Sequence, residues 1–477
     1  MYDMLITGGT VVGAEASFEA DVAVQGEKIV ALLEPGSDAG AGRKVDAKGL
    51  LVIPGGIDPH THLRDEHTGQ PVPGVGRMTA AAAVGGTTTF LDFTDPGRPG
   101  RLSEVLSARR RDFEGRTAID FGLHVAINRP GMHNLSHEPV DDMAKCVAQG
   151  APSFKAYLGF NQNAPAATDG LLFDAMAEAA RLGAVLGIHA ENAALIERVT
   201  QRLLGEGKES IEYFGAAKPP ITEEDCVEHC IRLAEEAGAA LYFVHLSTRG
   251  AAAAVGEARR HGLAVYGETC PHYLAFTDEV YRRPLEEAVK FVRFPPLRGP
   301  EHRDALWAAA REGWLSVLGT DHVTPISAAQ KLEAARGQPF NRLPGGMAQI
   351  ETRVPWLYSE GVTTGRISRQ QWVALVATNP ARIFGVYPRK GAIEVGADAD
   401  IVLFDPDLRW TVRASELAMG VDYTIYDGHT FTGKPVSAFQ RGRQIVDQGR
   451  FVGEPGAGRY LERRIAREVT ARSPGAP

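Results

Sequence analysis

Six side chains of this chain have the types, and follow the order, of a ligand set for two divalent metal ions. Each stands at the C-terminal end of a short apolar, β-branched or aromatic run. Imidazole and carboxylate groups suit zinc, manganese or iron, whereas calcium prefers oxygen ligands alone. One His-x-His pair would be weak evidence, because many surface strands carry such pairs, but six candidates in sequence are much harder to produce by accident. The candidates are His60, His62, Lys155, His189, His245 and Asp321.

Lys155, in the segment SFKAYLG, is the exceptional member of this set. A protonated ammonium cannot bind a cation, so this lysine could serve only if CO2 added to its amine and formed a carbamate that bridges both ions. That addition requires an unprotonated amine, and burial with nearby cations would lower the pKa enough to supply it. Taken alone, Lys155 would most simply be a buried salt-bridge partner; the five other candidates favour the carbamate.

The order of the candidates predicts two ions that share Lys155 as a bridge. A water molecule that bridges two such ions becomes hydroxide near neutral pH, and the second ion would polarise the scissile carbonyl. Asp321 would take the proton from the attacking hydroxide and deliver it to the leaving nitrogen. The predicted ligand sets are His60, His62, Lys155 and Asp321 for the first ion, and Lys155, His189 and His245 for the second.

The elements that must position these side chains have the pattern of a closed parallel barrel. Strand-like runs alternate with helical patterns, and eight such units predict a TIM-like (β/α)8 barrel over residues 54–389. In such a barrel all strand ends reach one face, where the site is built. The predicted strands are 51–62, 87–94, 120–127, 153–159, 185–191, 240–247, 264–270 and 315–321, and the helices between them include 102–114, 140–149, 171–182, 222–237, 249–260 and 301–312.

Both ends of the chain instead show short strands separated by turns. Residues 1–53 and 390–453 therefore predict one small β-domain built from the two ends, so that the expected fold class is α/β with a satellite domain. The segment 454–477 is basic and bounded by proline and glycine. It predicts a surface arm or an oligomer contact rather than part of a core.

Composition narrows the function classes. With 477 residues, 44% of them hydrophobic and 23% charged, the chain fits a soluble globular protein with a barrel and a second domain. A net charge of -8 argues against nucleic acid as a partner. Neither a secretory signal nor a membrane span is expected. The cysteines lack zinc-finger spacing and predict buried free thiols, which favours a cytoplasmic enzyme; they are Cys146, Cys226, Cys230 and Cys270.

Four further histidines receive separate interpretations. We expect His124, in GLHVAI, to be a hydrogen-bonded core residue. His272, in ETCPHYL, could line the pocket or pack beneath it, and both interpretations stay open. His67 and His322 follow candidate ligand segments, so they could hydrogen-bond to the ligands from behind.

Several segments in this order resemble the cyclic amidohydrolases, and most closely the dihydropyrimidinases and D-hydantoinases. They are PGGIDPHTHL, GAVLGIHAEN, GETCPHYL, FPPLR, GTDH and ATNPARIFGVYPRKGAIEVGADADIVLFDP, and the match covers nearly the whole chain. The resemblance implies hydrolysis of a ring amide, a binuclear zinc site with carboxylated Lys155, and commonly a homotetramer. We therefore expect a metal-dependent hydrolase that opens a small cyclic ureide or imide.

Three positions depart from that family pattern. A tyrosine that contacts the tetrahedral intermediate is replaced by Phe160, a serine before PPLR by Phe294, and an asparagine by Gly345 in RLPGG. Backbone contacts to substrate could survive at the last two positions. Losing one oxyanion donor can cost about 10²–10³ in turnover unless another group substitutes. The departures predict intact metal chemistry in an altered, more apolar substrate pocket.

Arg64, two residues after His62, leaves a second function open. Dihydroorotases carry an arginine there that binds the substrate carboxylate, and a guanidinium pairs with carboxylates through two parallel hydrogen bonds. A salt bridge to Asp65 or Glu66 is the alternative role. A dihydroorotase-like or allantoinase-like hydrolase of an anionic ring is thus the alternative enzyme. A non-catalytic scaffold, such as the collapsin response mediator proteins, is less favoured because those proteins lack the complete metal set.

Overall fold

The centre of the protein is a parallel sheet of nine strands that closes on itself, seen in a computed structural model. Its order begins at β15 and ends at β16, which follow each other in the chain, and β16 pairs with β8. This confirms the predicted (β/α)8 barrel. The strands are β8 (Gly56–His62), β9 (Thr87–Phe93), β10 (Asp120–Ala126), β11 (Ser153–Tyr157), β12 (Val185–His189), β13 (Ala240–Phe243), β14 (Val265–Thr269), β15 (Leu315–Leu318) and β16 (His322–Val323). The structure describes residues 1–63, 74–94, 100–128, 139–159, 166–324 and 326–472.

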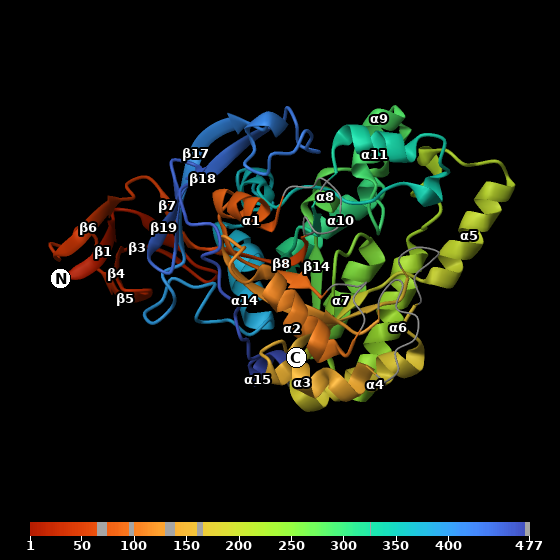
Figure 1. Ribbon diagram of the computed structural model, residues 1–477, viewed down its shortest axis with the longest axis horizontal. Coiled ribbons are helices and arrows are strands. Elements are labelled where there is room, and N and C mark those ends of the chain that lie inside the picture. The colour runs from red at the N-terminus through yellow and green to blue at the C-terminus, as the bar shows by residue number, and fades with distance from the viewer. Residues whose placement is uncertain (64–73, 95–99, 129–138, 160–165, 325, 473–477) are drawn as a thin grey trace.

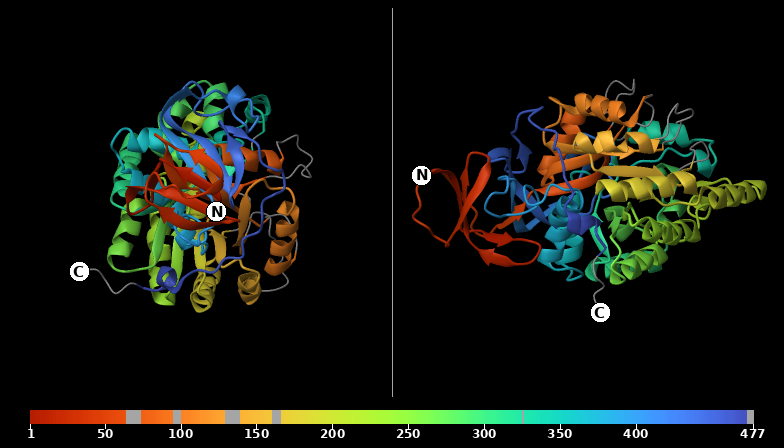
Figure 2. Two further views of the ribbon diagram at one scale, coloured as in Figure 1. Left: turned by 90° about the vertical axis from the view of Figure 1, so that its left-hand side faces the viewer. Right: turned by 90° about the horizontal axis from the view of Figure 1, so that it is seen from below.

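Helices surround these strands, as Figures 1 and 2 show. The six helices predicted from the sequence are present with nearly the expected bounds. Local signals explain several ends: the Thr168 side chain accepts a hydrogen bond from the Leu171 N–H at the start of α4, and Gly183 ends that helix in the left-handed region. The helices are α1 (Val75–Val84), α2 (Leu102–Phe113), α3 (Met143–Ala148), α4 (Asp169–Leu182), α5 (Ala193–Gly205), α6 (Ile221–Ala237), α7 (Arg249–Arg260) and α10 (Pro300–Arg311).

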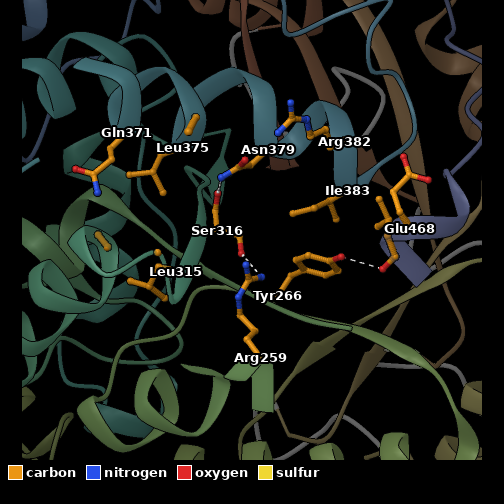
Figure 3. Close-up of a pocket in the computed structure, with 14 residues that line it drawn as sticks. Arg259, Tyr266, Leu315, Ser316, Gln371, Leu375, Asn379, Arg382, Ile383 and Glu468 are labelled. Atoms are coloured by element: carbon orange, nitrogen blue, oxygen red, sulfur yellow. Dashed lines mark hydrogen bonds between the residues drawn. The ribbon is translucent and has the colours of Figure 1, made fainter. Parts of the chain in front are cut away.

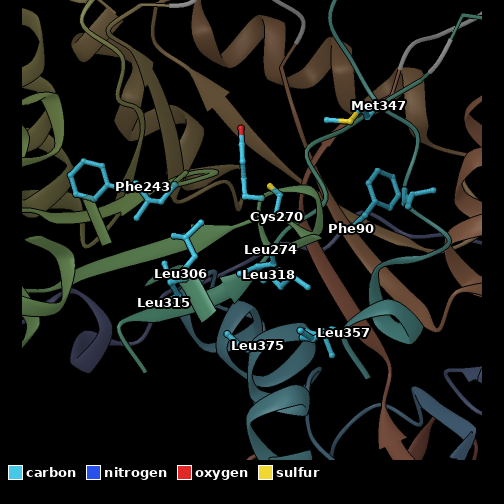
Figure 4. Packing of buried hydrophobic residues seen from close by; sticks show 14 of the residues in the cluster. Phe90, Phe243, Cys270, Leu274, Leu306, Leu315, Leu318, Met347, Leu357 and Leu375 are labelled. Carbon is cyan, nitrogen blue, oxygen red and sulfur yellow. The ribbon is translucent and has the colours of Figure 1, made fainter. Parts of the chain in front are cut away.

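Apolar side chains from strands and helices fill the space between the two layers. Figure 4 shows part of this core, where Leu315 and Leu318 of β15 lie near Leu306 of α10 and Leu375. These four side chains are all buried. Burying each such side chain contributes roughly 1.5–3 kcal/mol relative to leaving it in water. The packed core holds the strand ends, and therefore the site, in place.

Strands from the two chain ends form a small β-structure beside the barrel (Figures 1 and 2). Antiparallel pairing of β7 (Leu51–Pro54) with β17 (Ile401–Thr411) joins the ends in a seven-stranded sheet, as predicted. A second sheet contains N-terminal strands alone. Its members are β1 (Tyr2–Thr7), β4 (Asp21–Gln25), β5 (Lys28–Leu33) and β6 (Ala41–Asp46); the first sheet also contains β2 (Thr10–Val12), β3 (Ser17–Glu19), β18 (Thr430–Gln440), β19 (Arg443–Asp447) and β20 (Arg450–Phe451).

The predicted strand 51–62 is divided at Gly55, so that β7 joins the small sheet and β8 enters the barrel. A Cβ at Gly55 would lie 2.1 Å from Oγ1 of Thr88. Only glycine therefore fits where the chain passes so close to Thr88. The predicted strand 51–62 runs through Gly55, although the predicted domain boundary lies close by, between residues 53 and 54.

A buried lysine connects the barrel to the C-terminal strands. Nζ of Lys390 lies 2.8 Å from Asp120 of β10, 3.0 Å from Asp398 and 2.8 Å from Asp400. Burial alone would lower the pKa of Lys390, but the three carboxylates raise it above its usual value. The lysine thus stays charged and links the two parts. Among the described residues it is the only ion-pair partner of Asp400, so removing it would leave that buried carboxylate without a cation.

The C-terminal segment differs from its prediction. Leu461, Ile465 and Val469 are buried in a core cluster with barrel residues, and Arg463 donates to Oγ of Ser153 at 2.9 Å. The expectation that this arm takes no part in a core was therefore wrong for its described residues. Its apolar side chains recur every four residues between charged ones, so the surrounding charges concealed them.

The composition of the chain led to expectations about its cysteines and about membrane-spanning segments. All four cysteines are buried and free, as predicted. Within the described ranges, no helix combines the length and apolar character needed to cross a membrane.

Candidate metal centre

His60, His62 and Asp321 bring three ligand atoms to one point at the C-terminal end of the barrel strands. Oδ1 of Asp321 lies 3.2 Å from Nε2 of His60 and 3.2 Å from Nε2 of His62. The three ligand atoms all lie within 4.8 Å of one another. Two imidazole nitrogens and a carboxylate oxygen in this arrangement suit a divalent cation such as zinc.

Neighbouring side chains hold these imidazoles in position. Nδ1 of His60 donates to Oε1 of Glu268 at 2.6 Å, which turns its Nε2 toward Asp321. The ring of His62 stacks on Phe93, with centroids 4.8 Å apart. Burial lowers the pKa of His62, although Asp321 opposes the shift. The neutral imidazole is the form that binds a metal.

His189 and His245 form a second group beside the first. Nδ1 of His189 and Nε2 of His245 face each other at 2.9 Å, while Nε2 of His189 donates to Oε2 of Glu191 at 2.9 Å. The His245 ring lies 5.3 Å from the His60 ring, so the two groups are neighbours. Burial lowers the pKa of both His189 and His245. Both imidazoles are therefore neutral and offer nitrogens to a common position.

The backbone is strained at two of the candidate ligands. His245 has φ 41° and Asp321 has φ 49°, both in the left-handed region that residues with a Cβ rarely adopt. His245 lies two residues after the end of β13, and Asp321 lies three residues after the end of β15. Such strain costs of order 1–3 kcal/mol and persists only when surrounding contacts impose it. Here it turns both side chains into the site.

Lys155 lies on β11 with its amine buried and, among the described residues, without a hydrogen-bond partner. The nitrogen lies 5.5 Å from the centre of the Phe93 ring and 5.2 Å from that of Tyr157. Burial lowers the pKa of Lys155 to about 7, against opposing effects of Glu268 and Asp321. A carbamate forms only on an unprotonated amine, and this amine loses its proton readily. A carbamate would also be able to bind a partner where the buried amine has none in the described structure.

Comparison of the sequence with protein-family models identifies a family that matches most of this chain. A model described as the amidohydrolase family matches residues 51–431. The chain belongs to the amidohydrolase family. In this amidohydrolase, the matched segment contains every candidate ligand.

Relatives of known name resemble this amidohydrolase over almost its whole length. A D-hydantoinase of Geobacillus stearothermophilus is 38% identical over 463 residues, covering 96% of each chain. The structure of a D-hydantoinase from Bacillus sp. AR9 has a TM-score of 0.91 at 38% identity, covering 97% of this chain and 99% of that one. A dihydropyrimidinase structure from Brevibacillus agri NCHU1002 has a TM-score of 0.90 at 36% identity, with coverage of 97% and 99%.

Several residues of this amidohydrolase site were missed in the sequence. Glu268 and Glu191 hold the candidate ligands, and Lys218 donates to both oxygens of Glu191 at 3.1 and 2.9 Å. Burial would raise the pKa of Glu191, but Lys218 and His189 hold it at about 2. The available signal was local: Glu191 follows His189 by two positions in HAEN, and alternate strand residues share a face.

Arg293 is a further missed residue. Its guanidinium contacts both the carboxylate Oδ2 and the backbone carbonyl of Asp321. Burial would raise the pKa of Asp321, but Arg293 and the nearby imidazoles keep it well below its usual value. Asp321 is therefore a carboxylate with one oxygen toward the histidines and the other toward Arg293. The charged residue within the apolar run KFVRFPPLR was the signal that could have revealed it.

Two family departures lie against each other. A Cβ built on Gly345 would lie 2.7 Å from Cε2 of Phe294. The Phe294 ring also packs against Phe214, with centroids 5.6 Å apart, and Nζ of Lys218 lies 4.7 Å from its centre. The small Gly345 thus leaves room for the Phe294 ring. We therefore interpret the two departures from the family pattern as one linked change. Phe160, Arg64 and His67 lie outside the described residues.

The other histidines have distinct surroundings. His124 is buried and lies 2.7 Å from Oγ of Ser153 and 2.9 Å from the carbonyl of Pro59, which confirms a hydrogen-bonded core residue. His272 is buried and lies 2.7 Å from Nε2 of Gln349. Nδ1 of His322 accepts the Gln349 N–H at 3.2 Å. Among the described residues, Nε2 of His322 has no hydrogen-bond partner, so its ring forms no hydrogen bond to a candidate ligand, a role that the sequence had left open.

Proposed function

We propose that this protein is a hydrolase that opens the amide bond of a cyclic ureide or imide, a reaction of the dihydropyrimidinase and hydantoinase type. The observation that carries the proposal is the meeting of Asp321 with His60 and His62, with Oδ1 of Asp321 3.2 Å from both imidazole nitrogens. Full-length similarity to D-hydantoinases supports the same reaction. A metal-dependent cyclic amidohydrolase accounts for both.

The residues present fit two divalent ions, and we assign zinc as the metal. A pair of divalent ions needs nitrogen and oxygen ligands. The site supplies neutral imidazoles, an ionised carboxylate and the buried amine of Lys155, which has no hydrogen-bond partner among the described residues. When bound, the ions supply polarisation of the scissile carbonyl and activation of water near neutral pH. We further propose that Lys155 carries a CO2-derived carbamate that bridges them. His60, His62, Lys155 and Asp321 would hold the first ion, and Lys155, His189 and His245 would hold the second.

The chain's own groups then handle orientation and protons. Asp321, ionised in its surroundings, accepts a proton from the attacking water and delivers it to the leaving ring nitrogen. Glu268 and Glu191 keep His60 and His189 in their binding tautomers. Arg293 directs Oδ2 of Asp321, and the ring of Phe93 covers His62.

The substrate pocket favours a ring with an apolar substituent. Phe294 contributes an aromatic face next to Gly345, where the family pattern has two polar side chains. We assign Phe294 and Gly345 to the substrate pocket, together with Arg64 and Phe160. The substrate is a small molecule. A non-catalytic scaffold protein would have no need for this set of metal ligands.

The test is a ring-opening assay of purified, zinc-loaded protein. The panel contains dihydrouracil, hydantoin, 5-aryl hydantoins, allantoin, dihydroorotate and a cyclic imide, with Asp321→Asn as the inactive control. Turnover of dihydrouracil or a hydantoin supports the proposal. Turnover of dihydroorotate alone would replace it with the anionic-ring enzyme, in which Arg64 binds the substrate. No turnover with two ions bound would contradict it.

Wider properties follow from the same proposal. We propose a homotetramer, which light scattering after size-exclusion chromatography tests directly. Four buried free thiols suit the reducing cytoplasm. We also propose 54–389 as the catalytic barrel and 1–53 with 390–453 as the small β-domain, which limited proteolysis would test.

A further inference from the structure

A cavity lies at the N-terminal ends of β14 and β15 (Figure 3). The candidate metal centre is at the opposite, C-terminal end of the barrel strands. Its volume is about 280 Å³. Tyr266 and Ser316 contribute from the starts of the two strands, and the other walls come from four helical regions. These are α7, the end of α10, the stretch from α13 (Arg369–Val373) to α14 (Asn379–Ile383), and α15 (Arg467–Thr470).

One wall of this cavity carries an arginine without an acidic partner. Nη1 of Arg259 donates to the carbonyl of Val265 at 3.3 Å and to Oγ of Ser316 at 3.1 Å. Its Cζ lies 5.4 Å from the centre of the Tyr266 ring. No carboxylate of the described chain forms an ion pair with it. These contacts fix the guanidinium in place while leaving its charge available, which is the arrangement that binds a carboxylate through two donors.

The remaining lining combines apolar side chains with polar ones, among them Gln371, Arg382 and the carboxylate of Glu468. Leu315, Leu375 and Ile383 border the space around the guanidinium, as Figure 3 shows. Nδ2 of Asn379 donates to the carbonyl of Ser316 at 2.8 Å, and within the described residues its Oδ1 has no partner. The cavity therefore offers a cation, an apolar surface and a hydrogen-bond acceptor together. Small-molecule sites commonly join an apolar surface to a few placed polar groups, and here Arg259 and Asn379 are the polar groups beside the apolar side chains.

We propose that this cavity binds a small carboxylate with an apolar substituent and a neighbouring N–H donor. Arg259 pairs with the carboxylate, the three apolar side chains receive the substituent, and Asn379 accepts from the N–H. Ring opening of the kind proposed above yields such a molecule: water adds, the ring C–N bond breaks, and a carboxylate and a ureido or amide group result. Only the identification of the ligand as this product rests on the proposed function.

The test is isothermal titration of the full-length, metal-loaded protein with three ligands. N-carbamoyl-leucine has all three features, 4-methylpentanoate lacks the ureido group, and N-carbamoyl-leucinamide lacks the carboxylate. We expect saturable binding of the first that Arg259→Gln weakens at least about tenfold, the effect of losing a charge-assisted hydrogen bond. The matched control is Arg260→Gln, because Arg260 is the next residue of α7, is exposed and pairs with Glu257. It should bind as the unmodified protein does.

A second variant separates loss of binding from loss of folding. Ala374→Leu fills the cavity and keeps Arg259, so it should also abolish binding while its thermal midpoint stays near that of the unmodified protein. Binding of N-carbamoyl-leucinamide as tight as that of N-carbamoyl-leucine, or binding unaffected by Arg259→Gln, would overturn the proposal.

The two carboxylates distinguish the source of the ligand. Tighter binding of N-carbamoyl-leucine supports the reaction product, whereas equal binding of 4-methylpentanoate supports the carboxylate site and overturns that identification. Arg259-dependent binding in a protein that opens no ring would refute the proposed function alone, so the two failures are distinguishable.

Discussion

Oε1 of Glu268 lies 2.6 Å from Nδ1 of His60, although 208 residues separate them in the chain. Glu268 also accepts the hydroxyl of Tyr242 at 2.7 Å and the N–H of His245 at 2.9 Å. This buried carboxylate therefore positions one candidate ligand by its ring and another by its backbone. It belongs to neither predicted ligand set, yet by binding Nδ1 it leaves Nε2 of His60 as the nitrogen that faces Asp321.

Replacing Glu268 should weaken metal binding. In Glu268→Gln the carboxylate that fixes the His60 tautomer is lost, so we expect affinity to fall about 10–100-fold. Competition with a chromogenic chelator measures this directly. Glu257→Gln, an exposed change on α7, is the control. Unchanged affinity in Glu268→Gln would show that His60 needs no such partner.

Glu191 should act on the other ion. It holds His189, so Glu191→Gln should lower the zinc content from two equivalents toward one after dialysis, with the first ion retained. Elemental analysis of both glutamate variants, each with a chelator series, compares the two positions. Equal loss of both ions in each variant would contradict the division of ligands between two sites.

Lys155 should form its carbamate in a pH-dependent way. The pKa of Lys155 is lowered to about 7 by burial, so in metal-free protein the amine is protonated below that pH and free above it. The carbamate signal in ¹³C NMR with labelled bicarbonate should therefore rise between about pH 6 and pH 8. Lys155→Ala should show no signal and no activity, with partial rescue by a short carboxylic acid. Turnover at the unmodified rate in Lys155→Ala would refute the carbamate.

Phe294 and Gly345 should be energetically coupled. Gly345→Asn alone places a Cβ within 2.7 Å of Phe294, and such overpacking costs about 1–3 kcal/mol. Phe294→Ser removes the ring, so the double variant should be more stable than the sum of the single changes predicts, by at least about 0.5 kcal/mol. Thermal unfolding of the four proteins completes the cycle. Strict additivity would show that the two residues do not compensate each other.

Glu351 should make stability depend on pH. Burial raises the pKa of Glu351 from 4.5 to about 7, against the hydrogen bond from the Met419 N–H. The native state then binds the proton more tightly than the unfolded state, so stability falls as pH rises from 4.5 to about 7 and stays reduced above it. Glu351→Gln should stabilise the protein by on the order of 2–3 kcal/mol near pH 8 and by little near pH 4.

Thermal midpoints at the two pH values measure this difference. The exposed change Glu333→Gln serves as the control. Equal effects of Glu351→Gln at both values would contradict the raised pKa.

Much of the fold was predictable because its signals are local. Apolar runs mark β8, β11 and β12. Histidine ends β8 and β12, Lys155 lies two residues before the end of β11, and each strand ends at or near its predicted limit. Helices such as α7 carry their own capping residues, and Thr248 accepts the N–H of Ala251 at its start. Side-chain type and strand alternation need no distant partner, so the order of the candidate ligands could also be obtained from the chain alone.

The tertiary structure alone determined the contacts between residues that are distant in the sequence. The pairing of Glu268 with His60, the approach of Arg293 to Asp321, and the fit of Phe294 over Gly345 depend on barrel closure, which brings strand ends and loops to one face. The buried tail and the cavity at Arg259 arise in the same way. Sequence by itself determined which groups could bind metal, because that is a property of residue type. Their tautomers, charges and neighbours came only with folding, because burial and a specific partner set each of them.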